Sequence, residues 1–152
     1  MAASCERIED LPDEPKIEYD SFLLKDTVDL LDNLIKQGKL IFSFTDGDGD
    51  IGLSDADSLP PYCDSCDYHY NLFITLYEKS DTGFIPVDQE IPLYYRIPYA
   101  VPEGQNKTLK GQIVVDFEYN PILYDTIKYE FYIVDRALHH SNIETTPEII
   151  LQ

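Results

Sequence analysis

Apolar and polar residues alternate along several segments of the chain, as they do in strands that bury one face. In residues 39–44 the alternating positions on one face are Leu40, Phe42 and Phe44. Three longer segments repeat the pattern, with inward positions at Tyr68, Tyr70, Leu72, Ile74 and Leu76, at Ile113, Val115, Phe117 and Tyr119, and at Ile127, Tyr129, Phe131 and Ile133. Each of these segments is predicted to be a strand.

Shorter candidate strands complete the set. They lie at residues 16–24, 83–87, within 91–104 and at 147–152, with Gly, Pro, Asn or Asp between them. Pro86 suits an edge position, because proline cannot donate to the ladder. The spacing predicts an all-β fold, an immunoglobulin-like or fibronectin III-like antiparallel β-sandwich of about seven or eight strands.

Residues 26–38 carry a different pattern. Val28, Leu31 and Ile35 are spaced at helical intervals, with Asp26 as a cap and Gly38 as a stop. This spacing predicts a short helix, and a second short strand is the alternative.

Composition and charge limit the classes of function. The aromatic residues are 12 Tyr and 7 Phe, and the net charge is −18. Such a charge argues against nucleic-acid binding and against docking to anionic lipid, both of which need Lys and Arg clusters. It is compatible with cations, with cationic partners or with solubility alone.

The first residues differ from the rest of the chain. Residues 1–15 are acidic, contain proline and have no apolar period, which predicts a disordered, flexible tether before a single domain at 16–152. The opening residues MAASC resemble the lipobox of bacterial lipoproteins. That likeness predicts a lipid on Cys5, and an ordinary cysteine is the alternative.

A wider resemblance enters at residues 129–142. A Tyr-rich alternating strand is followed by Asp135, Arg136, Ala137, Ser141 and Asn142, a sequence similar to the closing strand of bacterial immunoglobulin-like modules. With residues 44–53 and 109–119, the region 38–151 resembles uncharacterised envelope lipoproteins of the Bacteroidota type. The histidines at 139 and 140 depart from the Gly-Asn turn that is commoner there.

The resemblance implies an outer-membrane lipoprotein, on the periplasmic or the surface face, that contacts the membrane only through its lipid anchor. We expect a non-catalytic binding or structural module whose partners are other envelope proteins or glycans. The alternative is a carbohydrate-binding module of a surface glycan-uptake system.

The stretch FTDGDGDIGLSDAD at 44–57 carries the candidate metal chemistry. Asp46, Asp48 and Asp50 fill positions 1, 3 and 5 of a calcium loop, Gly52 the carbonyl position 7 and Asp57 position 12. Ile51 stands where the EF-hand has glycine, and a strand precedes the loop, so a calcium site on a sandwich loop is favoured over an EF-hand. A solvated acidic turn is the alternative, because Asp-Gly pairs are common in turns.

Cys63 and Cys66 form a C-x2-C pair followed by His69. A local disulfide, free thiols and half of a zinc site completed by His139 or His140 are the three interpretations.

Two further groups complete the candidates. Tyr94, Tyr95, Arg96 and Tyr99 form a candidate ligand platform, with strand core or edge cover as the alternative. The histidines near Ser141 and Asp135 lack any nucleophile elbow, so no enzymatic activity is expected.

Overall fold

The computed structural model describes residues 10–119 and 123–152, and within these ranges every regular element is a strand. The bounds are β1 Lys16–Val28, β2 Leu34–Asp46, β3 Leu72–Ser80, β4 Gly83–Pro86, β5 Leu93–Tyr95, β6 Leu109–Tyr119, β7 Thr126–Ile133, β8 Glu144–Thr145 and β9 Ile149–Ile150. In the described part of the chain, no helix is long and apolar enough to cross a membrane.

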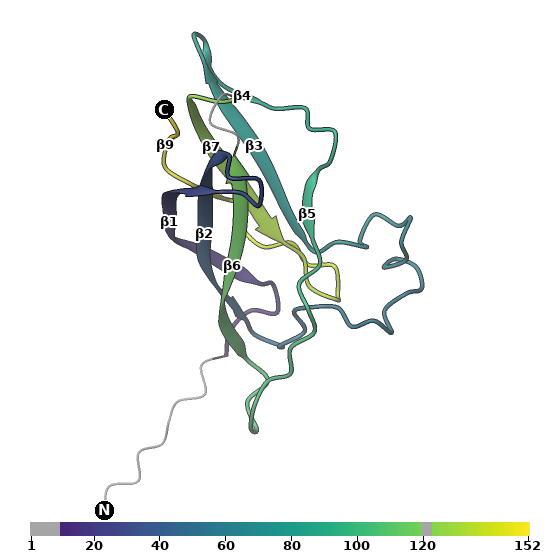
Figure 1. The fold of residues 1–152 in the computed structure, drawn as a ribbon. Coiled ribbons are helices and arrows are strands. Elements are labelled where there is room, and N and C mark those ends of the chain that lie inside the picture. The colour runs from purple at the N-terminus through teal and green to yellow at the C-terminus, as the bar shows by residue number, and fades with distance from the viewer. Residues whose placement is uncertain (1–9, 120–122) are drawn as a thin grey trace, which may run out of the picture.

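The strands form two antiparallel sheets packed as a sandwich (Figure 1). The three-stranded sheet has the order β1-β2-β6, and β2 pairs with β1 from Leu34 to Thr45 and with β6 from Lys36 to Asp46. The other sheet is built on β3 and β7, with β4 and β5 on the outer side of β3 and with β8 and β9 along β7. The predicted all-β sandwich is confirmed.

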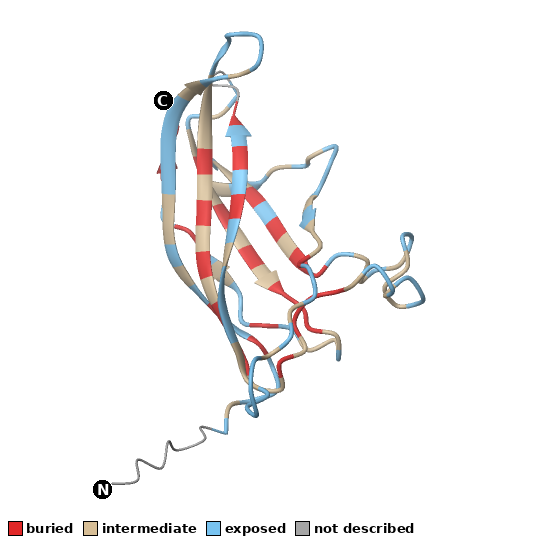
Figure 2. Cartoon of the chain, turned by 60° about the horizontal axis from the view of Figure 1, so that its bottom comes forward, coloured by how far each residue is buried: buried red, intermediate tan, exposed pale blue. Residues whose placement is uncertain are grey.

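The core lies between the sheets, and the strands alternate between buried and more exposed residues (Figure 2). Phe42 packs on Phe131 with ring centroids 4.8 Å apart, so the two sheets meet through these rings. The buried side chains from the two long central strands and their partners include Leu40, Phe42, Phe44, Leu72, Ile74, Leu76, Val115, Phe117, Ile127, Tyr129, Phe131 and Ile133. Each was expected on an inward face.

The predicted helix at 26–38 is wrong, because this segment is the hairpin that joins β1 to β2. Asp29 closes the turn, and its Oδ1 accepts the N–H groups of Leu31 and Asn33 at 2.8 and 3.0 Å. Asp32 adopts a positive φ of 61°, a conformation that ends a helix. Of the three residues with helical spacing, Val28 and Leu31 are exposed on the hairpin and Ile35 is partly exposed, so the spacing does not mark a buried face.

The strand expected to begin at Tyr68 begins instead at Leu72. Tyr68 and Tyr70 lie in the long loop between β2 and β3, where the cis peptide Pro60-Pro61 also occurs. The alternating pattern therefore extends into residues that do not pair with another strand.

Candidate metal centre

Four aspartates meet at one end of the sandwich. Asp46 ends β2, Asp48 and Asp50 follow in the loop, and Asp135 comes two residues after β7. One carboxylate oxygen from each lies within 4.8 Å of the others. Because β2 and β7 belong to different sheets, the cluster connects the two layers of the sandwich.

Two glycines allow the loop to turn its carboxylates inward. A Cβ on Gly47 would lie 2.2 Å from the Pro12 carbonyl oxygen, and one on Gly49 would lie 2.0 Å from the Lys107 carbonyl oxygen. Gly49 also has a φ of +70°, which glycine adopts at little cost. The Gly47 N–H donates to the Pro12 carbonyl at 3.0 Å, so the chain before β1 holds the loop in place.

Hydrogen bonds satisfy only part of the cluster. The Asp50 N–H donates to Asp46 Oδ2 at 2.8 Å, and the Ala137 N–H donates to Asp50 Oδ2 at 3.2 Å. The carboxylate of Asp135 accepts the backbone N–H of His139 at 2.8 Å and contacts its ring Nδ1 at 2.9 Å. The Oδ1 atoms of Asp46, Asp48 and Asp50 are buried and lack a hydrogen-bond partner in the described chain.

The cluster is also poor in nearby positive charge. Within the described ranges, the only ion pair to any of its members is that of His139 with Asp135. The Arg136 guanidinium lies close by, but its Nε donates to the backbone carbonyl of Asp50 at 3.1 Å. Three carboxylate oxygens that have no hydrogen-bond partner in the described part of the chain thus lie together, and that part supplies no cation paired with them.

Burial and mutual repulsion change how the carboxyl groups titrate. Burial, and then the charges of Asp50, Asp48 and Asp135, raise the pKa of Asp46 to about 7 against the backbone hydrogen bond from Asp50. Burial, and then Asp135 and Asp48, raise the pKa of Asp50 to about 6. Asp46 is fully inaccessible to solvent, so its negative charge is costly unless a cation neutralises it.

The geometry suits calcium. Calcium holds oxygens at 2.3–2.6 Å, so two ligands on opposite sides of one ion are about 4.6–5.2 Å apart. The four carboxylate oxygens all lie within 4.8 Å of one another, close enough to share one calcium ion. Magnesium, with oxygens at about 2.1 Å, needs a tighter group and keeps more of its water. Carboxylate oxygens alone, with no thiolate or imidazole, are the donors that a hard cation prefers.

The structure does not bring every residue of the expected calcium loop to this centre. Asp57 lies outside the cluster, and its Oδ2 accepts the N–H and hydroxyl of Ser54 at 2.7 and 2.9 Å. Gly52 lies beside the bridge between Leu53 and Pro98, and a Cβ there would come within 2.2 Å of the Pro98 carbonyl oxygen. Asp135 joins the cluster instead, and only the pairing of the sheets brings it there from 85 residues away.

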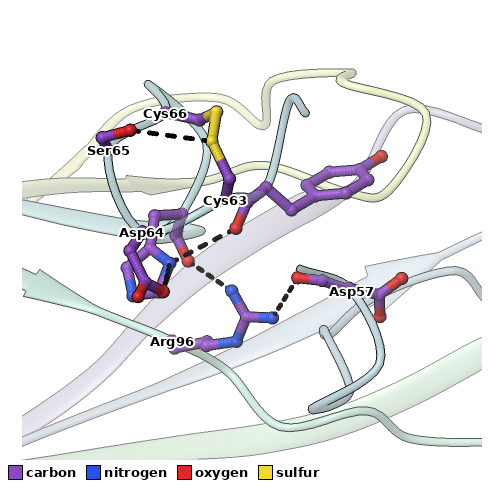
Figure 3. Close-up of a disulfide and its surroundings, with 8 residues drawn as sticks. Asp57, Cys63, Asp64, Ser65, Cys66 and Arg96 are labelled. Atoms are coloured by element: carbon purple, nitrogen blue, oxygen red, sulfur yellow. Dashed lines mark hydrogen bonds and ion pairs between the residues drawn. A yellow bond between two sulfur atoms is a disulfide. The ribbon is translucent and has the colours of Figure 1, made fainter. Parts of the chain in front are cut away.

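The C-x2-C pair forms a disulfide between Cys63 and Cys66 on the β2–β3 loop (Figure 3). Arg96, the residue after β5, binds this loop. Its guanidinium donates to the carbonyls of His69, Ser54 and Asp57 at 2.7–2.8 Å. In the disulfide neither sulfur is a thiolate ligand for zinc. His69 contacts the Tyr62 carbonyl and the Asp64 carboxylate rather than the other histidines.

The candidate platform is divided among different contacts. Arg96 is bound to the loop carbonyls, and Tyr95 points toward the core side of β5. The Tyr99 ring lies under Arg136, whose guanidinium carbon is 4.3 Å from the ring centroid. Only Tyr94 joins a larger aromatic group on the outer face, against Phe73 at 5.0 Å.

That outer group is a ladder of rings across β3 and β7. Phe73 stacks on Tyr132 at 5.1 Å, and Tyr132 stacks on His140 at 5.4 Å, with interplanar angles of 17° and 15°. The rings therefore cover one another's faces. Sequence reasoning missed this set because His140 reaches it from a turn.

The histidines near Ser141 do not form a triad. The Ser141 hydroxyl donates to the Asn142 carbonyl at 2.7 Å and accepts the Ile133 N–H at 3.0 Å, so it is engaged with backbone. The Asp135 contact raises the pKa of His139.

The predicted lipidation site, Cys5, lies outside the described residues. Comparison with known proteins adds no assignment, because no family model, curated protein or solved structure matches the chain.

Proposed function

We propose that the protein is a non-catalytic binding or structural module of the bacterial cell envelope, and that a calcium ion stabilises its sandwich. The observation that carries the calcium site is the set of buried Oδ1 atoms of Asp46, Asp48 and Asp50, which have no partner in the described chain and lie beside Asp135. Calcium would neutralise this group and connect the end of β2 to the segment that follows β7.

Two features support a place outside the cytoplasm. The Cys63–Cys66 disulfide is a bond that persists in oxidising compartments. The residues before Cys5 resemble a lipobox, and the sequence resembles envelope lipoproteins. Envelope exteriors are also where weak calcium sites are filled, since extracellular modules bind the ion at about 10⁻⁴–10⁻³ M.

Thermal unfolding of the full chain tests the calcium site. A ligand that binds only the folded state raises the melting temperature by mass action. We expect a rise when millimolar calcium replaces EDTA, a smaller rise with magnesium, and none in Asp48→Ala. An unchanged melting temperature with calcium would reject the site, and an equal rise with sodium chloride would indicate charge screening instead.

A carbohydrate-binding module is the second candidate. Its support is Tyr94, which joins the aromatic ladder through Phe73, and the neighbouring Tyr70, whose ring centroid is 6.2 Å from that of Tyr94; Tyr70 and Tyr94 are 40% and 42% exposed. The mutual stacking of the rings leaves less free face for sugars, so a protein partner is favoured. Glycan-array binding that Tyr94→Ala abolishes would reverse this order.

A further inference from the structure

The sandwich is open along one side, where the long strand β6 has a single neighbour. β6 pairs with β2 on one side, and none of the other described strands pairs with its second side. In an edge strand every second residue directs its N–H and C=O away from the sheet. The 11 residues of β6 thus present a free row of backbone donors and acceptors.

An apolar groove runs beside this edge. A cavity of about 600 Å³ lies between β6 and the segment 95–100, and core side chains such as Phe44, Ile51 and Leu72 form its floor. A second cavity of about 300 Å³ continues it along the C-terminal half of β6 and shares Tyr95 and Asp116 with the first. The groove therefore follows β6 along most of its length.

The inward face of β6 is incompletely covered where the larger cavity lies. Val115, Phe117 and Tyr119 are buried, whereas Leu109, Gly111 and Ile113 are on the same face and remain partly or fully exposed. Gly111 brings no side chain to this face, so the groove reaches the Phe44 ring. The opposite sheet ends on this side in β5, a strand of only three residues.

We propose that this groove accepts an extended segment of a partner protein, which pairs with β6 as an additional strand. Strand addition uses the free backbone groups for affinity and pockets for alternate side chains for specificity. The segment would place apolar side chains at every second position into the groove. This inference rests on the proposed function as a binding module, but it does not depend on calcium.

The charges on β6 indicate which polar side chains the partner segment would carry. The outward positions of β6 beside the smaller cavity are Asp116 and Glu118, and an added strand sets its outward side chains directly across from them. Asp116 has one cation, Lys39, at 3.6 Å on the β2 side. With a net charge of −18, the chain favours Lys or Arg at the positions of its partner that face Asp116 and Glu118.

The test uses the full chain and a synthetic peptide of about eight residues, the length that spans the cavity side of β6 at ~3.4 Å per residue. The peptide alternates valine with lysine. Its controls are a block-shuffled peptide of the same composition and an alternating peptide with glutamate for lysine. Amide hydrogen exchange read by mass spectrometry reports whether β6 gains protection.

A pair of variants locates the binding. Ala100→Phe fills the larger cavity from the loop side, and Val101→Phe adds the same ring one residue away, outside the residues that line it. We expect the alternating lysine peptide to protect residues 109–118, and Ala100→Phe to weaken it at least about tenfold. Val101→Phe is expected to bind as the unchanged chain does. Melting curves show whether each variant is folded.

Other results would overturn the proposal. Equal binding of the shuffled peptide, or binding without protection of β6, would mean a charge attraction alone. Protection of β6 in a dimer without peptide would assign the edge to a second copy. Binding of an apolar dye, with no peptide binding, would assign the cavity to a small ligand. Because each measurement is repeated in EDTA, loss of the calcium effect and loss of peptide binding are read separately.

Discussion

Asp46 is a carboxylate that the fold places in a buried position, where its negative charge is unfavourable. It continues the alternation of β2, so its side chain points inward with Leu40, Phe42 and Phe44. A carboxylate there is fully buried, and one of its oxygens has no hydrogen-bond partner among residues 10–119 and 123–152. Its charge therefore opposes folding in the absence of a cation and favours folding when a cation binds.

This dual role predicts opposite effects for Asp46→Asn. The amide keeps an acceptor for the Asp50 N–H and can donate to a neighbouring Oδ1, so in EDTA we expect an unfolding free energy equal to that of the unchanged chain or higher by about 1 kcal/mol. In calcium the variant is expected to lose the rise in melting temperature. Denaturant unfolding in both buffers measures this.

Asp57→Asn is the matched control, since Asp57 lies in the same acidic stretch but caps Ser54. It is expected to keep the full calcium response. If Asp57→Asn removed the response and Asp46→Asn did not, the centre would lie elsewhere in the loop.

The raised pKa values set a pH dependence. An acid whose pKa is higher in the folded state than its ordinary value binds more protons when folded, so stability falls as pH rises between the two values. For Asp46 and Asp50, with pKa values raised from 3.8 to about 7 and about 6, the ion-free chain should lose stability from about pH 4 to about pH 7. His139, whose pKa is also raised, contributes with the same sign.

Calcium competes with these protons, so its effect should run the other way. The difference in melting temperature between calcium and EDTA is expected to grow from pH 5 to pH 8. Asp46→Asn should reduce both slopes, while His139→Gln should leave the calcium slope in place. A calcium effect independent of pH would contradict binding by these two carboxylates.

At the scale of elements, the sequence predicted the strands correctly where one face of the strand is buried. The alternation in residues 39–44, 109–119 and 126–133 predicted both the strands and their inward faces, because burial on one side imposes a period of two. It was insufficient at 26–38, where the Asp29 turn outweighed the helical spacing of Val28, Leu31 and Ile35. Turn hydrogen bonds of this kind leave no periodic signal.

The candidate site, too, was predicted from the sequence only in part. Local spacing identified three of the four clustered aspartates, since neighbours in a loop remain neighbours in space. Asp135 joins the cluster in place of Asp57 because of how β2 and β7 pack, which no local motif encodes. The contacts of the candidate aromatic platform could not be predicted for a similar reason, because Arg96 is directed to the carbonyls of a loop distant in sequence.

Arg96 is accordingly predicted to support the β2–β3 loop. Lysine cannot reproduce a planar fork that donates to three carbonyls, so Arg96→Lys should lower the free energy of unfolding by roughly 1–3 kcal/mol. Denaturant titration measures the loss, and hydrogen exchange should be faster in residues 54–70. Lys39→Arg, an exposed exchange of the same two residue types, should change stability by less than about 0.5 kcal/mol. Unchanged stability in Arg96→Lys, with loss of binding to a glycan or protein, would return Arg96 to a recognition role.

At the scale of the whole molecule, the two sheets are joined differently at their two ends. The β3–β4 hairpin projects from one end, and at the other the aspartate cluster gathers the end of β2, the chain before β1 and the turn after β7 (Figure 1). The core holds the middle of the sandwich together, so the cluster is where repulsion among buried charges would first separate the layers. A cation at this position acts between sheets rather than within one loop.

This arrangement predicts that calcium protects two distant parts of the sequence together. In hydrogen exchange, residues 44–50 and 133–139 should slow to a similar extent when calcium replaces EDTA, because one ion holds both. Residues 78–86, at the opposite end, should exchange equally fast in both buffers and serve as the internal control. Asp135→Asn should remove the protection of both segments, although it changes only the turn after β7. Protection confined to residues 46–50 would instead describe a loop that binds calcium by itself, and the ion would then have no part in holding the sheets together.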